Sequence, residues 1–254
     1  MQCGEMRLLV LVIATNKPLC QMHTEYWRRV LATCPSNVDV RFVYGEPTIC
    51  SAVVDGPQAS QPRSLLVRTR ESFIPGILVK TMQAMKYLLP TEANTMVEQE
   101  GDSRYEWILR TNTSTFVHFD NLSKLLPTLD PSAYYGAMNK RAASGGNQTF
   151  AVGFFILFSS SSARRLIDRY DLPENQKTKT LPDDVALARL AQQAGMTFRS
   201  LHALTVLPHL FHRHLAHPKR GIIAIRNRNY QPPDRRMVEE KKRWEQIIEM
   251  YSIA

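Results

Sequence analysis

The chain has 254 residues, of which 44% are hydrophobic, so it is long and apolar enough to bury a core and is not a disordered polymer. Its net charge of +9 predicts attraction to phosphate groups, whether of nucleotides, nucleic acids or anionic membranes. The apolar run over 8–14 is shorter than the ~20 residues of a membrane span. It also lacks the basic flank and cleavage site of a signal peptide, so we expect a cytoplasmic protein with no transmembrane segment.

The first half of the chain alternates predicted strands with helices. Residues 6–15 form a continuous apolar run, which is typical of a strand covered on both faces. After it we expect a helix over 19–33, a strand over 38–44, a loop over 45–61, a short strand over 64–67, a helix over 77–89 and a strand over 107–110.

The second half continues the alternation, which predicts an α/β fold. We expect a short helix over 122–129, a strand over 134–138, a polar loop over 140–149, a buried strand over 151–158 and a helix over 159–170 with serines as N-caps. A polar loop over 171–181, a helix over 184–194, an irregular segment over 202–217, an edge strand over 222–226 and a helix over 235–252 follow. No linker divides the chain, so we expect one domain over 1–254.

Two polar stretches stand out as candidate sites. Residues 107–120 read W-I-L-R-T-N-T-S-T-F-V-H-F-D, so a strand core ends in hydroxyl and amide side chains. Open α/β sheets bind ligands at the carboxyl ends of their strands, although such residues also form ordinary turns. Residues 182–195 place Asp183 and Asp184 at the start of a helix, where they are either helix-stabilising carboxylates or a catalytic base.

Four further segments have a recognisable order: E-S-F with I-L-V-K-T in 71–81, R-T-N-T-S-T-F-V in 110–117, G-F-F-I-L-F-S in 153–159 and P-D-D-V in 182–185. Together they resemble a GT-A-type glycosyltransferase, similar to β1,3-glycosyltransferase and Fringe-like enzymes and to the small soluble transferases of large DNA viruses of algae. The resemblance implies a GT-A-like (Rossmann-like) mixed sheet flanked by helices. It also implies a nucleotide-binding part over about 1–117 and an acceptor and catalytic part over about 118–254.

The resemblance further implies an inverting transfer of a sugar from a nucleoside diphosphate, with UDP the expected nucleotide, to a hydroxyl of a glycan or glycoprotein. Asp184 matches the family's base, with Asp183 in reserve. The acceptor would meet Gly153, Phe154 and Phe155. The donor would meet Thr15, Asn16, Lys80, Arg110, Thr111, Asn112, Thr113 and Ser114.

The chain departs from the family at the D-x-D motif, whose carboxylates hold a divalent metal. Asn112 and Ser114 stand at those positions, and neutral oxygens are poor ligands for a hard cation. Mn²⁺ or Mg²⁺ would therefore be held weakly or be absent, with Asn112, Ser114 and His212 as its possible ligands. His212, Arg226 and Arg228 would then neutralise the phosphates, since guanidinium groups bind phosphate without a metal.

Two other functions remain open from the sequence. The positive charge also suits a basic nucleic-acid-binding protein, but no nucleic-acid motif accompanies it, so we expect no nucleic-acid partner. The loss of D-x-D also suits a transferase-like fold that binds a sugar without catalysis.

Overall fold

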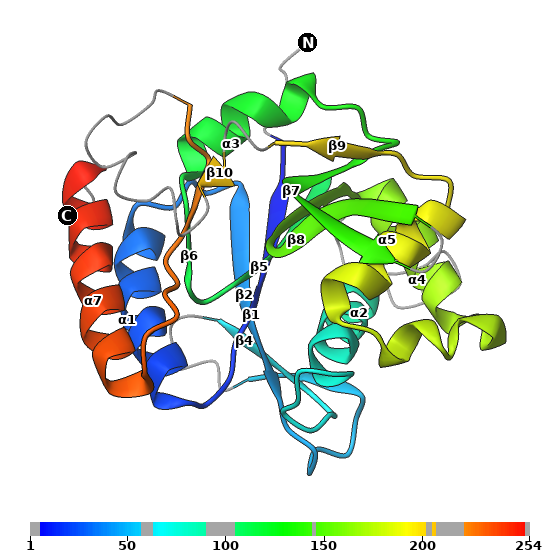
Figure 1. Ribbon diagram of the computed structural model, residues 1–254, viewed down its shortest axis with the longest axis horizontal. Coiled ribbons are helices and arrows are strands. Elements are labelled where there is room, and N and C mark those ends of the chain that lie inside the picture. The colour runs from blue at the N-terminus through cyan, green and yellow to red at the C-terminus, as the bar shows by residue number, and fades with distance from the viewer. Residues whose placement is uncertain are drawn as a thin grey trace.

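The computed structural model describes residues 6–56, 63–89, 105–143, 146–201, 205–206 and 221–251, with the side chains of 140–148 and 233–234 left aside. Two sheets and two layers of helices make up this part of the chain (Figure 1). The main sheet has eight strands in the order β3-β4-β2-β1-β5-β8-β7-β9. Their bounds are β1 Leu8–Ile13, β2 Val38–Gly45, β3 Val53–Asp55, β4 Ser64–Val67, β5 Trp107–Asn112, β7 Tyr134–Ala143, β8 Gly146–Ser159 and β9 Phe198–Ser200.

Strand β1 lies at the centre of the main sheet and pairs in parallel with β2 on one side and β5 on the other. The chain first moves outward from β1 through β2 to β4, and then returns to the opposite side of β1 as β5. Beyond β5 the sheet becomes mixed, because β8 runs antiparallel to both β5 and β7. This reversal of strand order beside β1 is the place where open α/β sheets form ligand crevices.

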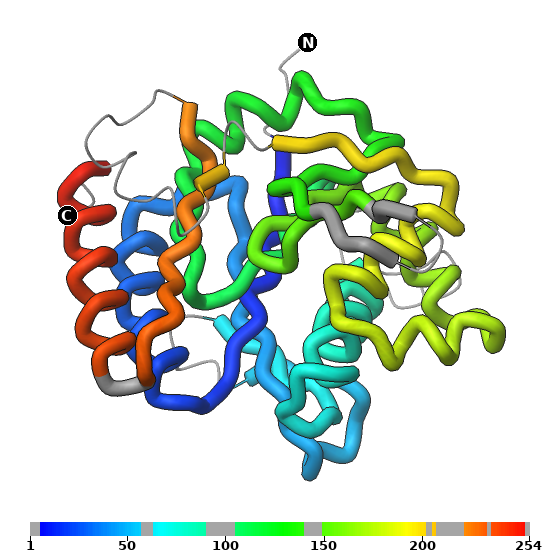
Figure 2. Tube along the Cα trace, in the orientation of Figure 1, coloured from blue at the N-terminus to red at the C-terminus, as the bar shows by residue number. Residues whose placement is uncertain are grey.

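Helices cover both faces of the sheet, as the trace of the chain also shows (Figure 2). Helices α1 (Pro18–Ala32) and α7 (Pro233–Met250) lie together on one face, while α2 (Gly76–Leu88), α4 (Ser160–Asp171) and α5 (Asp183–Gln193) cover the other. Along β1, Leu8, Val10 and Val12 join the core under α1 and α7, and Leu9, Leu11 and Ile13 join the core under α2, α4 and α5. Burial on both faces explains the unbroken apolar run, and the predicted α/β class with a mixed, helix-flanked sheet is confirmed.

A small second sheet brings three distant segments together. Its order is β10 (Thr205–Val206), β11 (Ala224–Arg226) and β6 (Thr115–Val117). Strand β11 pairs with β10 on one side and β6 on the other, so the prediction of an edge strand here is wrong. The antiparallel register sets Arg226 opposite Thr115, directly after the polar end of β5.

Several other predictions need correction. Residues 140–143 and 146–149 of the predicted polar loop belong to β7 and β8, because backbone pairing continues beyond the apolar part of both strands. Segment 45–61 contains β3, and helix α3 runs over Phe119–Leu125, three residues earlier than expected. It is followed by a 3₁₀ turn over Leu126–Thr128, and the polar stretch 171–181 holds two more, Pro173–Asn175 and Thr178–Thr180.

One capping prediction is confirmed. The Ser159 hydroxyl accepts a hydrogen bond from the Ser162 backbone N–H and caps α4. None of the helices in the described part of the chain is long and apolar enough to cross a membrane. The division into nucleotide-binding and acceptor parts stays a prediction.

Gly136 is needed for steric space and Gly195 for its backbone conformation, and this difference gives a test of the fold. A Cβ at Gly136, in the irregular pairing of β7 with β8, would lie 2.4 Å from the Phe155 carbonyl oxygen and 2.5 Å from the Ala151 Cβ. Gly195 follows α5 with a φ of +72°, yet its Cβ would meet no atom within 4 Å. We expect Gly136→Ala to cost about 1–3 kcal/mol, because the strands must separate.

Gly195→Asn serves as the control. Asparagine tolerates the left-handed conformation that ends this helix, so we expect a loss of about 1 kcal/mol or less. Urea unfolding of both variants measures the difference. A Gly136→Ala variant as stable as the wild type would contradict the register of this hairpin.

Candidate active site

The predicted donor residues gather at the carboxyl ends of β1 and β5. The parallel register sets Asn112 beside Ile13, so Thr15 and Asn16 follow β1 next to the polar turn that follows β5. Asn16 is exposed and Thr15 is half-buried. Thr111 is buried, and its hydroxyl donates to the Phe154 carbonyl oxygen at 2.7 Å, which joins β5 to β8. The structure thus brings the ends of β1 and β5 beside the middle of β8.

The turn from Asn112 to Thr115 is closed by its own side chains. Asn112 Oδ1 accepts hydrogen bonds from the Ser114 hydroxyl at 2.9 Å and the Thr115 hydroxyl at 2.8 Å. Outside groups hold its backbone, since Trp27 Nε1 donates to the Thr113 carbonyl and the Asn227 N–H donates to the Ser114 carbonyl. These bonds join the turn to α1 and to the residue after β11, so the shape of the turn is fixed before any ligand binds.

This turn does not fit a divalent metal. Mn²⁺ and Mg²⁺ prefer carboxylate oxygens, whereas Asn112 and Ser114 offer neutral ones, and Asn112 Oδ1 already accepts two hydrogen bonds. Within the described ranges no three His, Cys, Asp or Glu side chains cluster in a way that would hold an ion. His212, the third predicted ligand and a predicted phosphate-neutralising residue, lies outside the described residues.

Arg110 is a cation buried in the sheet. It projects from β5, is 2% exposed, and donates from Nη2 to Asp183 Oδ2. Its Nε and Nη1 are buried and have no hydrogen-bond partner among the described residues. Gly153 makes room for it, because a Cβ there would lie 2.9 Å from Arg110 Nη1 and 3.3 Å from Asp183 Oδ2. Arg110 therefore has spare donors beside a glycine on β8.

The two adjacent carboxylates have different surroundings. Pro182 occupies the N-cap of α5, and Asp183 and Asp184 stand in the first turn. Asp183 is buried and paired with Arg110. Asp184 is half-buried, and its Oδ1 accepts the Val185 N–H at 2.9 Å. Burial, with a smaller contribution from the charge of Asp183, raises the pKa of Asp184 above its ordinary value. Asp184 is thus the more accessible of the two, and the one that is not engaged by Arg110.

Arg226 in β11 lies near Arg110, and Arg228 follows two residues later. The Arg226 guanidinium lies 5.3 Å from the centroid of the Phe154 ring, and Arg228 lies over the Tyr230 ring at 5.4 Å. Burial first, and then repulsion by Arg228 and Arg110, lowers the pKa of Arg226 to about 10. The Nε atoms of Arg226 and Arg228 are buried without a hydrogen-bond partner in the described part of the chain. Positive charge held in this way favours an anionic ligand.

Lys80 is committed to the protein itself. Its Nζ is fully buried and donates to the Ala14 carbonyl and to Glu71 Oε2, both at 2.8 Å. Glu71 Oε1 in turn accepts the Gly45 N–H at 2.7 Å, so this pair ties the end of β1 to the end of β2. Burial lowers the pKa of Lys80, a shift opposed by Glu71. Its contact with a donor stays a prediction, as does contact of an acceptor with the Phe154 and Phe155 rings, which are buried in the core.

The sequence analysis missed the residues that hold Arg226 and Arg228. Asn227 and Asn229 alternate with these arginines and are buried, at 0% and 8% exposure. The sequence R-N-R-N-Y over 226–230 contains this signal, because alternation places successive side chains on opposite sides of an extended chain. Charge by itself identifies only Arg226 and Arg228 in this segment.

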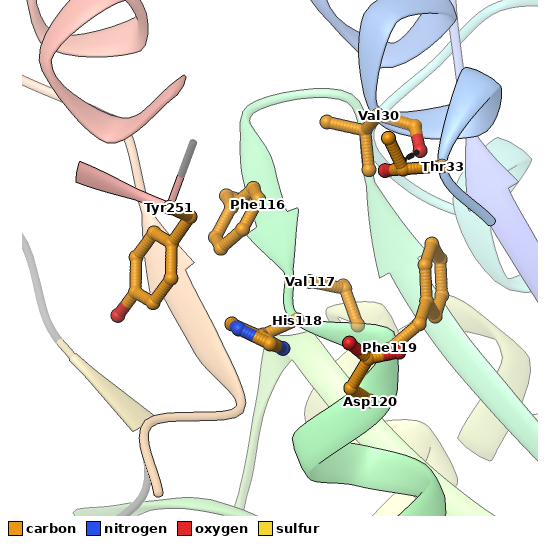
Figure 3. Close-up of a pocket in the computed structure, with 8 residues that line it drawn as sticks. All are labelled: Val30, Thr33, Phe116, Val117, His118, Phe119, Asp120 and Tyr251. Atoms are coloured by element: carbon orange, nitrogen blue, oxygen red, sulfur yellow. Dashed lines mark hydrogen bonds between the residues drawn. The ribbon is translucent and has the colours of Figure 1, made fainter. Parts of the chain in front are cut away.

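A separate cavity of about 170 Å³ lies elsewhere (Figure 3). Its lining comes from the end of α1, from β6 and the start of α3, and from Tyr251 after α7. The rings of Tyr251 and Phe116 stack with centroids 5.0 Å apart, and His118 meets Tyr251 edge-on at 4.9 Å. No predicted site residue lines this cavity, so we assign the site to the strand ends.

No family model matches the chain, and no curated protein matches it. Solved structures with a similar arrangement include a glycosyltransferase involved in glycosylation of the major capsid of PBCV-1, with 9% identity and a TM-score of 0.49 over 94% of this chain and 98% of that one. The galactosyltransferase LgtC, in complex with donor and acceptor sugar analogs, has 10% identity and a TM-score of 0.48 over 92% and 95%. The glycosyltransferase GlyE of Streptococcus pneumoniae TIGR4 has 13% identity and a TM-score of 0.47 over 96% and 63%. Similarity at this level carries no conclusion about the reaction, which is inferred only from the residues of the site.

The Arg110–Asp183 pair gives a test of the site's construction. Asp183→Asn leaves the Arg110 charge buried without its partner, so we expect a loss of stability of about 3–5 kcal/mol. The double variant Arg110→Met/Asp183→Leu removes both charges and should recover most of that loss. Urea unfolding of Arg110→Met, Asp183→Leu and the double variant completes a double-mutant cycle that measures the coupling.

The exposed pair of Lys86 and Asp171 is the control for this cycle. Asp171→Asn should change the free energy of unfolding by about 1 kcal/mol or less, because solvent screens the charges. Equal, small effects at both pairs would show that Arg110 and Asp183 are not in contact.

Proposed function

We propose that this protein is a glycosyltransferase that moves a sugar from a nucleoside diphosphate, most simply UDP, to a hydroxyl of a glycan or glycoprotein with inversion at the sugar carbon. One observation carries the proposal: a half-buried carboxylate of raised pKa, Asp184, stands beside a buried arginine with unused donors at the carboxyl ends of β1 and β5. A base next to an anion-binding group is what such a transfer requires.

The arginines suit the leaving diphosphate. Arg110 and Arg226 have buried N–H groups without partners among the described residues, and guanidinium groups bind phosphate oxygens through two parallel hydrogen bonds. Negative charge develops on the diphosphate as its bond to the sugar breaks, and fixed positive groups stabilise that charge. These cations would take the place of the metal for which Asn112 and Ser114 are unsuited.

Asp184 suits the other half of the reaction. The acceptor oxygen attacks the anomeric carbon and gives its proton to an Asp184 carboxylate oxygen, while the carbon–oxygen bond to the diphosphate breaks and its electron pair leaves with the nucleotide. A base is more effective when its pKa is raised toward the working pH, and burial raises that of Asp184. Asp183 is occupied by Arg110 and serves to hold it.

Asp184→Asn should have opposite effects on transfer and on stability. Loss of the base should reduce transfer by ~10²–10⁴-fold while nucleotide affinity stays near that of the wild type. Because the folded-state pKa of Asp184 exceeds the unfolded value, its charged form disfavours folding above both values, and this cost disappears as the pH falls below the unfolded pKa of ~3.9. The variant should therefore be more stable than the wild type at pH 7, and this difference should disappear at pH 3.

Steady-state transfer assays, nucleotide titration and urea unfolding at the two pH values measure these effects. Val185→Ala, the next residue along the helix, is the control for transfer, since it adds and removes no charge. Normal turnover by Asp184→Asn would refute the assignment of the base. If that variant binds a nucleotide sugar and the wild type shows no turnover, the chain is a sugar-binding protein without catalysis.

Binding of the donor should need no divalent metal. A panel of nucleotide sugars, each tested by thermal shift in EDTA and in Mn²⁺, should give the same stabilisation in both, and ligand at ~100 times its dissociation constant should add ~2.7 kcal/mol. Binding and turnover that vanish in EDTA and return with Mn²⁺ would show that a metal does what we assign to arginine. No shift with any donor, together with steeply salt-dependent binding to random RNA, would instead identify a nucleic-acid-binding protein.

A further inference from the structure

Hydrogen bonds from the buried residues Asn227 and Asn229 anchor the segment from Arg226 to Tyr230. Asn227 Nδ2 donates to the Glu240 carbonyl oxygen at 2.6 Å, and the Asn229 N–H donates to Glu240 Oε1 at 2.7 Å. The Asn227 N–H also donates to the Ser114 carbonyl at 2.7 Å. One residue of α7, Glu240, thus holds the chain on which Arg226 and Arg228 are carried, and Asn227 ties that chain to the turn after β5.

Glu240 is fully buried and its carboxylate receives three donors. Oε2 accepts from His23 Nε2 at 2.9 Å, and Oε1 accepts from the Asn229 N–H and from Arg236 Nε at 2.8 Å. These hydrogen bonds keep the pKa of Glu240 below its ordinary value despite its burial. A carboxylate with every neighbour donating to it is well satisfied, although it lies far from solvent.

The direction of the hydrogen bonds requires a carboxylate at this position. Trp244 Nε1–H donates to His23 Nδ1 at 2.7 Å, so His23 carries its proton on Nε2 and must donate it to residue 240. A glutamine amide has one accepting and one donating end. In either orientation its NH₂ group would face another donor, His23 in one case and Asn229 with Arg236 in the other.

We infer that Glu240 is a positioning residue, which through Asn227 and Asn229 holds Arg226 and Arg228 beside Arg110 as one binding site for a diphosphate. Arg226 is repelled by both Arg228 and Arg110, so a fixed chain is needed to keep these charges at one site. The inference rests on the proposed function, because it concerns how the same donor site is built. It adds residues on α1 and α7, which contact no ligand, to the machinery of that site.

Isothermal titration of the full chain with inorganic pyrophosphate, and separately with UDP, tests the inference. Glu240→Gln should weaken pyrophosphate binding by ~10-fold or more, because small displacements of binding groups are costly, and Arg226→Gln should weaken it comparably. Glu245→Gln is the matched control. Glu245 lies on the same helix and accepts from Tyr26 and Arg29 of α1 at 2.7 and 3.0 Å, but makes no described contact with 226–230. Its substitution should leave the dissociation constant within about twofold, since the Glu245 side chain is half exposed and both of its partners lie on α1.

Urea unfolding of each variant separates positioning from simple stability. A merely structural Glu240 would lower the unfolding midpoint and leave the dissociation constant of the folded protein unchanged, and that result would overturn the inference. If Glu240→Gln does not fold, Asn227→Ala removes one anchor and keeps the backbone bond to Ser114; it should weaken pyrophosphate binding, and unchanged binding would overturn the inference equally.

The two proposals fail in different ways. Loss of binding in Arg226→Gln, with wild-type binding in a folded Glu240→Gln, refutes the positioning role and leaves the proposed function standing. A wild-type chain that binds neither pyrophosphate nor UDP refutes both.

Discussion

The buried charge of Arg110 is the constraint around which the candidate site is built. A guanidinium at the end of a central strand is costly to desolvate unless a partner and close packing accompany it. Asp183 supplies the partner from the first turn of α5, and Gly153 supplies the space on β8. Asp183 is engaged in this way, whereas its neighbour Asp184 is half-buried, and that burial raises its pKa. One ion pair therefore separates two adjacent carboxylates into a holding group and a candidate base.

A second set of buried hydrogen bonds holds the segment that carries Arg226 and Arg228. Glu240 and His23 lie 217 residues apart, yet their hydrogen bond joins α7 to α1 beneath the segment that carries Arg226 and Arg228. On the same side Trp27 holds the carbonyl of Thr113. The turn after β5 and the arginine segment are thus attached to the same pair of helices. The Arg110–Asp183 pair and the Glu240 hydrogen bonds hold the two parts of the site for the same physical reason, which is that buried charged groups require partners.

The sequence determined the class of fold and the location of the candidate site. The unbroken apolar run of β1 required burial on both faces, and the alternation of strands and helices required an α/β sheet. The polar residues after Arg110 and the acidic pair after Pro182 were identifiable because both interrupt apolar segments at element ends. These are local signals, and each depends only on residues within one or two turns of chain.

Only the tertiary structure decided which of those groups meet. The contact between Arg110 and Asp183 spans 73 residues, and no periodicity records it. Residues 140–143 and 146–149 pair as strands despite their polar sequence, because their backbone groups find partners across the strand pair. Glu240 looked like one charge among many on a helix, and only the fold places it at 0% exposure among three donors. Burial and pairing arise only when distant segments come together. They therefore set the chemistry of a side chain, which the identity of the residue alone does not determine.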